Sequence, residues 1–113
     1  MNSRNKGKGG ELEAARVLRL YGYDARRGQQ YKGGADSPDV VGVPRLHIEV
    51  KRTEHFALYD ALEQSKRDAG DNEIPVVMHR KNRRPWVMVL SVADFMELYR
   101  IYELYKESED NTQ

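Results

Sequence analysis

The segment PDVVGVPRLHIEVKR (residues 38–52) decides the fold prediction, because it contains two apolar runs separated by a very short connection. A connection of this length between DVVGV and RLHIEVKR predicts a β-hairpin. In the second run, apolar and polar residues alternate, so Glu49 and Lys51 project from the same face of the strand. Asp39 stands directly before the apolar part of the first run. We therefore expect the hairpin to bring Asp39 and Glu49 together, with Lys51 beside them.

The rest of the chain predicts a mixed α/β sheet flanked by helices. A helix is expected from about Gly10 to Tyr21, where Gly22 supplies a stop signal. A second helix is expected in FALYDALEQSKRDAG, and a closing helix in SVADFMELYRIYELYK begins after the capping residue Ser91. The remaining expected strands are YDARR, IPVVMHR and PWVMVLS.

Length and composition bound the class of protein. A chain of 113 residues is expected to form one domain, with residues 1–9 as a flexible basic arm and residues 106–113 as a disordered acidic tail. No apolar run is long enough to cross a bilayer and no signal peptide is recognisable, so an intracellular, cytoplasmic protein is expected. The absence of cysteine excludes disulfides, thiolate metal sites and cysteine nucleophiles. Any metal must therefore be held by oxygen or histidine ligands.

The net charge of +1 hides an uneven distribution of charge along the chain. Residues 1–34 carry eight basic residues and three acidic ones, and the segment HRKNRR adds four more basic residues. The chain from Asp94 onward is acidic. Local basic patches on a nearly neutral protein indicate a polyanion bound at one face. The alternative is that these patches are solvated loops.

Two carboxylates with no histidine or cysteine cluster nearby favour a hard divalent cation such as Mg²⁺. Asp39 and Glu49 would supply ligands, with the Val50 carbonyl as a third, and Lys51 would act on a water molecule and offset phosphate charge. This arrangement suits hydrolysis of a phosphodiester. The alternative is a surface hairpin in which Glu49 and Lys51 form an ordinary pair, because E-x-K often occurs by chance.

Two further acids bear on this site. A helical wheel places Glu11 within the apolar arc of the first helix and Glu13 on the opposite face. An inward acid must be satisfied by a partner, which makes Glu11 a candidate site residue. Asp36 competes with Asp39 as the metal ligand, and Asp39 is favoured because it abuts the strand and would be rigidly placed.

The same residues resemble a known family. PDVVGVPRLHIEVK is similar to the PD-(D/E)XK nuclease signature, and KGKGGELEAARVLRLYGY resembles the opening helix of archaeal-type Holliday junction resolvases. The resemblance covers residues 5–92, and KRDAG followed by IPVVMHRKNRRPW resembles a branch that bacteriophages and prophages encode. It implies a restriction-endonuclease-like fold, with a mixed central β-sheet flanked by α-helices.

The resemblance also implies roles for individual residues. Asp39 and Glu49 would ligate Mg²⁺, for which Mn²⁺ is expected to substitute, Lys51 would serve the water, and Glu11 would be an additional acid. Gln64 resembles a glutamine that some relatives place near the site. The alternative for Gln64 is an ordinary glutamine on a helix surface.

The leading functional prediction is a Mg²⁺-dependent endonuclease acting on branched DNA, most specifically a Holliday junction resolvase. The resemblance implies that such an enzyme works as a two-fold symmetric homodimer on a four-way junction. One alternative is a general or nicking nuclease without junction specificity, and another is a DNA-binding protein that keeps the fold without catalysis. The residues expected to contact DNA phosphates are Lys6, Lys8, Arg26, Arg27, Lys32, Arg80, Lys81, Arg83 and Arg84.

Overall fold

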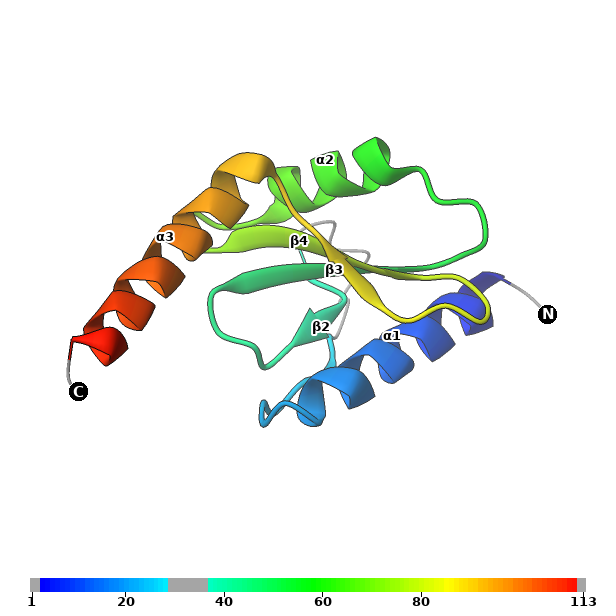
Figure 1. The fold of residues 1–113 in the computed structure, drawn as a ribbon. Helices are drawn as coiled ribbons and strands as arrows, with labels where there is room; N and C mark the ends of the chain where they lie inside the picture. Colours follow the sequence, from blue (N-terminus) through cyan, green and yellow to red (C-terminus); the bar gives the residue numbers. More distant parts are fainter. Residues whose placement is uncertain (1–2, 29–36, 112–113) are drawn as a thin grey trace.

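A computed structural model describes residues 3–28 and 37–111 of the chain, with side chains described from residue 7 (Figure 1). The predicted order of elements and the α/β class are confirmed. In chain order the elements are α1 (Ser3–Arg19), β1 (Arg26–Arg27), β2 (Val40–Val41), β3 (Leu46–Arg52), α2 (Leu58–Asp68), β4 (Ile74–Arg80), β5 (Val87–Val89) and α3 (Val92–Asp110).

Within the described residues, the strands form one five-stranded sheet in the order β1-β2-β3-β4-β5. The hairpin prediction is confirmed, because β2 and β3 are antiparallel, with Val40 opposite Ile48. β1 extends this antiparallel half of the sheet. β3 and β4 are parallel along their whole length, and α2 makes the crossover between them. β4 and β5 are again antiparallel, so the sheet is mixed.

Helices cover both faces of the sheet, α1 on one side and α2 on the other (Figure 1). Ala14 and Ala15 of α1 are fully buried in one cluster with Ile48 of β3 and Met78 of β4. On the other face, Ser65 of α2 donates a hydrogen bond to the His47 carbonyl at 3.2 Å. The alternation predicted for β3 therefore holds, and its polar residues lie on the α2 side.

The predicted start of the first helix is wrong. α1 begins at Ser3 and not near Gly10, so residues 3–9 belong to a helix and not to a flexible arm. The polar, Gly- and Lys-rich composition of residues 1–10 predicts a flexible arm, whereas a single glycine weakens a helix by only about 1 kcal/mol. Gly10 is needed for packing, because a Cβ at this position would lie 2.6 Å from Cβ of Arg52.

The predicted tail is also wrong in part, because α3 continues to Asp110. Glutamate and lysine are good helix formers, and Lys106 lies 3.6 Å from Glu109 one turn later. The predicted cap is confirmed, since the backbone N–H of Asp94 donates to the Ser91 hydroxyl at 3.1 Å. In the part of the chain that is described, no helix is both long and apolar enough to cross a membrane.

Candidate active site

Asp39 is held by several hydrogen bonds immediately before β2. Its backbone N–H donates to the Ile48 carbonyl and its own carbonyl accepts from the Gly28 N–H, both at 2.8 Å. Its side-chain Oδ2 accepts a hydrogen bond from the Val50 N–H, also at 2.8 Å. The residue is only 8% exposed. These contacts bear out the rigidity that favoured Asp39, while its rival Asp36 lies outside the described residues.

Gly28 explains why β1 can approach Asp39 so closely. A Cβ at Gly28 would lie 2.2 Å from the carbonyl oxygen of Pro38, a distance that no side chain can accept. The glycine thus permits its N–H to bind the Asp39 carbonyl. This hydrogen bond continues the pairing of β1 with β2 up to Asp39, the candidate metal ligand.

Glu11 of α1, Asp39 immediately before β2 and Glu49 of β3 come together, with Asp39 hydrogen-bonded to both glutamates, and we call them the acidic cluster. Burial, and after it the charge of Glu49, raises the pKa of Asp39 from 3.8 to about 6. Burial also raises the pKa of Glu49, to which Asp68 and Glu11 add their repulsion. The three carboxylates therefore share a poorly solvated site in which full ionisation is unfavourable.

Glu11 joins this cluster from the first helix. Burial raises the pKa of Glu11, the Arg27 hydrogen bond lowers it, and the charge of Asp39 raises it. Arg27 donates from Nε to Oε2 of Glu11 at 2.5 Å, so this predicted DNA contact is engaged with the acidic cluster. The inward position predicted for Glu11 from the helical wheel is thus confirmed.

Glu13 is also partnered, which the helical wheel did not predict. Its carboxylate accepts hydrogen bonds from the Arg80 guanidinium and, at 3.0 Å, from Nε1 of Trp86. It therefore faces the β4–β5 side of the sheet, away from the acidic cluster. Arg80, which was expected to contact DNA, is occupied by this ion pair.

Lys51 follows Glu49 by two residues on the same face of β3 and is half-buried. Its positive charge lowers the pKa of both Asp39 and Glu49, although burial keeps both values raised. Lys51 and Gln64 line one open pocket of about 300 Å³, together with Phe56 and Asp60. Gln64 and Lys51 thus border the same pocket, and a role for Gln64 in the site stays a prediction.

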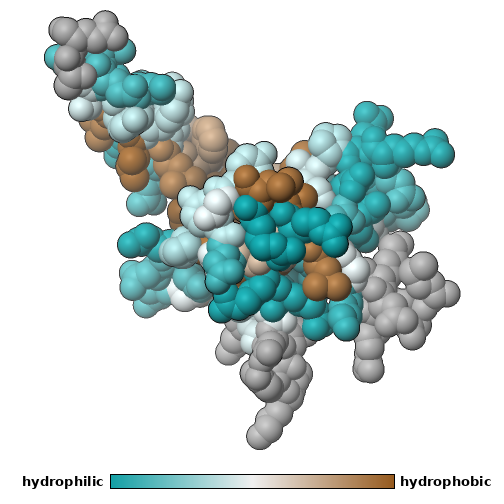
Figure 2. Space-filling model, turned by 90° about the horizontal axis from the view of Figure 1, so that it is seen from below, coloured by the Kyte–Doolittle hydropathy of each residue, from teal (hydrophilic) through white to brown (hydrophobic). Residues whose placement is uncertain are grey.

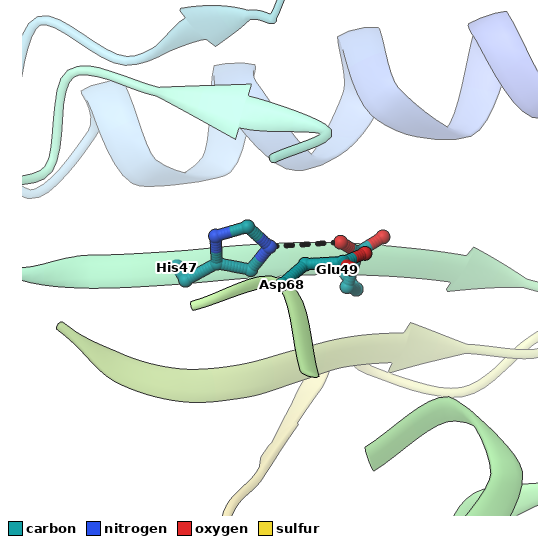
Figure 3. Close-up of side chains that lie close together, drawn as sticks. All are labelled: His47, Glu49 and Asp68. Carbon is teal, nitrogen blue, oxygen red and sulfur yellow. Dashed lines mark hydrogen bonds and ion pairs between the residues drawn. The ribbon is translucent and has the colours of Figure 1, made fainter. Parts of the chain in front are cut away.

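A second group of side chains supports Glu49 from the α2 side (Figure 3). Nε2 of His47 lies 3.0 Å from Oε1 of Glu49, and Nδ1 of His47 lies 3.6 Å from Oε1 of Glu73. One ligand atom from each of His47, Glu49 and Asp68 lies within 4.8 Å of the others, a grouping that could hold a metal ion. His47 is 1% exposed, so its contacts restrict the orientation of the Glu49 carboxylate.

The sequence carried only a partial signal for this second group. Strand alternation places His47 on the face of Glu49, but it does not indicate that the two side chains bind. Asp68 lies at the edge of the apolar stripe of α2, and only the packing of α2 on the sheet brings it to Glu49. The contact of Glu73 with His47 follows from the turn before β4 and could not be predicted.

Three basic residues remain exposed in the turn between β4 and β5, and we call Lys81, Arg83 and Arg84 the basic turn. They line an open hollow of about 670 Å³ with Glu54, His55 and Asn82. Two other predicted DNA contacts are exposed elsewhere: Arg26, whose guanidinium lies 3.4 Å from the Asp24 carboxylate, and Lys8 on α1. Lys32 and the side chain of Lys6 lie outside the described residues.

The structure thus brings the four central candidates, Glu11, Asp39, Glu49 and Lys51, into one region, with Gln64 on its border. Asp39 interacts electrostatically with Glu11, Glu49 and Lys51. Comparisons with protein-family models, curated proteins and solved structures give no match to this chain.

Proposed function

We propose that this chain is a Mg²⁺-dependent DNA endonuclease of the PD-(D/E)XK type. The observation that carries the proposal is the acidic cluster beside Lys51, in which burial and mutual repulsion raise the pKa of each acid. The element order supports a restriction-endonuclease-like fold, because a helix and three antiparallel strands are followed by a crossover helix and a parallel strand. Such an enzyme would act in the cytoplasm.

The chemistry of the acidic cluster fits a hard divalent cation. All of its side-chain donors are carboxylate oxygens, the ligands that Mg²⁺ prefers. Asp39 and Glu49 would hold the ion, with Glu11 and the Val50 carbonyl as further donors. A bound cation would offset the repulsion that raises these pKa values, and it would polarise a phosphodiester and make water a better nucleophile.

The residues of the chain would divide the remaining tasks. Lys51 would hold a phosphate oxygen or a water molecule next to the cluster, where its charge already acts on Asp39 and Glu49. His47 and Asp68 would act as positioning residues, since they contact or repel Glu49 and need not touch substrate. The basic turn would bind DNA phosphates without reading sequence.

Within this class we propose branched DNA, and specifically a four-way junction, as the substrate. The resemblance of the opening helix and the hairpin to Holliday junction resolvases supports this choice. A general or nicking nuclease would use the same acidic cluster and Lys51, because one fold serves many substrates. The substrate class is therefore tested separately from the cleavage chemistry.

The cleavage chemistry is tested with supercoiled plasmid DNA, with Mg²⁺ or with EDTA. We expect nicking only with Mg²⁺, and we expect Glu49→Gln to abolish it while DNA binding is retained or strengthened. Glu63→Gln is the matched control, because Glu63 is an exposed glutamate on α2. The proposal would be contradicted if Glu49→Gln still nicked the plasmid. It would also be contradicted if the wild type bound DNA but did not nick it in Mg²⁺.

A further inference from the structure

Helix α3 leaves an apolar surface uncovered. The helix projects from the domain (Figure 1), and none of its residues is buried. Hydrophobic side chains follow it outward from the body of the molecule (Figure 2). Nine large apolar residues of α3 are between 41% and 78% exposed: Val92, Phe95, Met96, Leu98, Tyr99, Ile101, Tyr102, Leu104 and Tyr105. An apolar surface of this extent marks an interaction site.

Most of these residues lie on one side of the helix. At 100° per residue, six of them fall within an arc of about 160°, and we call them the α3 stripe. Glu97, Arg100 and Glu103 lie on the opposite side, as do Met96 and Leu104, whereas Asp94 and Lys106 lie within the arc near its two ends. The α3 stripe consists of Phe95, Leu98, Tyr99, Ile101, Tyr102 and Tyr105.

Neighbouring side chains of the stripe contact one another along the helix. The rings of Phe95 and Tyr99 stack with their centroids 6.2 Å apart, and the rings of Tyr99 and Tyr102 are 6.3 Å apart. Lys106 lies over the Tyr102 ring at 5.7 Å. Side chains held in this way lose less conformational entropy when a partner binds.

We propose that the α3 stripe binds the same stripe of a second copy of this chain, with the two helices antiparallel. A two-fold symmetric interface must be self-complementary. The α3 stripe meets this condition, because its positions are symmetric about Arg100. An antiparallel pair centred there places Phe95 opposite Tyr105, Leu98 opposite Tyr102, and Tyr99 opposite Ile101.

Charge and area favour the same occupant. The antiparallel register also places Asp94 of one copy opposite Lys106 of the other, so each pair of helices gains two attractive contacts at its ends. An aromatic residue can bury about 150–250 Å², so six half-exposed residues offer on the order of 600 Å² per chain. Two chains would bury on the order of 1,200 Å², above the roughly 1,000 Å² that a specific interface needs.

This inference rests on α3 alone and is independent of the proposed nuclease activity. A two-fold pair would also supply two acidic clusters, as cleavage of two opposed strands requires. Loss of the dimer and loss of cleavage are separate results, because metal-dependent nicking of one strand needs only one cluster.

The test is the mass of the full chain in solution, measured by light scattering or sedimentation over a wide range of protein concentrations. The wild type is expected at twice the chain mass of 13.1 kDa. Leu98→Glu should weaken the dimer at least about tenfold, because it buries an unpaired charge in the interface. Leu104→Glu makes the same change on the opposite side of α3 and should leave the dimer intact, and circular dichroism checks that both variants are folded.

The antiparallel register has its own test. Asp94→Lys and Lys106→Asp should each weaken the dimer, and the double variant should restore it, because the exchanged charges again face each other across the two-fold axis. A wild type that stays monomeric at every concentration would overturn the proposal. Equal loss in Leu98→Glu and Leu104→Glu, or no restoration in the double charge exchange, would also overturn it.

Discussion

Replacing Asp39 by Asn should stabilise the metal-free protein while abolishing cleavage. Burial and the charge of Glu49 raise the pKa of Asp39 from 3.8 to about 6. Because the pKa is higher in the folded state, folding favours the protonated acid, and this contribution to stability is complete below pH 3.8 and is lost as pH rises through about 6. Near pH 7.5 the folded protein must therefore carry an unfavourable ionised carboxylate.

The magnitude follows from the two pKa values. A difference between 3.8 and about 6 corresponds to about 3 kcal/mol of unfolding free energy at pH values well above 6. Asn is neutral and keeps an oxygen that can accept the hydrogen bond from the Val50 N–H. Its amide can also donate to Glu11 or Glu49. We expect a gain of about 1–3 kcal/mol for Asp39→Asn, or about 4–13 °C in Tm.

The assay is thermal or urea unfolding of wild type and Asp39→Asn in EDTA, at pH 7.5 and at pH 4.5, beside a plasmid cleavage assay. The gain should be largest at pH 7.5 and should shrink at pH 4.5, where Asp39 is largely protonated. Asp71→Asn, at an exposed acid in the turn before β4, is the control and should change little. A variant that is less stable than wild type at pH 7.5, or equally stabilised at both pH values, would refute this reasoning.

Three further changes test the division of roles around the site. Glu11→Gln should lower the cleavage rate at least about tenfold, whereas Glu13→Gln should leave the cleavage rate near that of the wild type. Glu13→Gln should instead cost about 1 kcal/mol of stability, because its hydrogen bonds are lost. Equal cleavage rates in the two variants would contradict the placement of Glu11. Asp68→Asn should move the acidic limb of the pH–rate profile to lower pH, because the charge of Asp68 raises the pKa of Glu49; an unmoved limb would show that Asp68 does not act on Glu49. Replacing the basic turn with alanines should weaken DNA binding and reduce its salt slope by about 3, as measured by binding titrations at several salt concentrations, and an unchanged slope would place the turn away from DNA.

Local patterns predicted the parts of the fold that depend on local physics. The hairpin follows from two apolar runs with a very short connection, and the common face of Glu49 and Lys51 follows from strand alternation. Glu11 could be singled out because a helical wheel needs only the periodicity of one helix. The placement of these residues could therefore be predicted from local patterns, whereas their roles in a site stay predictions.

Contacts between residues far apart in the chain were not predictable. Arg80 carries a charge that suggests a DNA contact, yet it pairs with Glu13, 67 positions earlier. The approach of Asp68 to Glu49 depends on how α2 packs across the sheet. The start of α1 was not predictable from composition, because a polar, Gly- and Lys-rich segment indicates flexibility, whereas Gly10 packs against Arg52.

The most direct test of the nuclease proposal is cleavage of a labelled synthetic four-way junction beside a linear duplex of the same sequence, with Mg²⁺ and with EDTA. The proposal predicts paired, symmetric nicks on the junction in Mg²⁺, with none in EDTA and little cutting of the duplex. Equal cutting of both substrates would contradict the junction specificity, and metal-independent binding of both substrates without any cutting would contradict the nuclease itself.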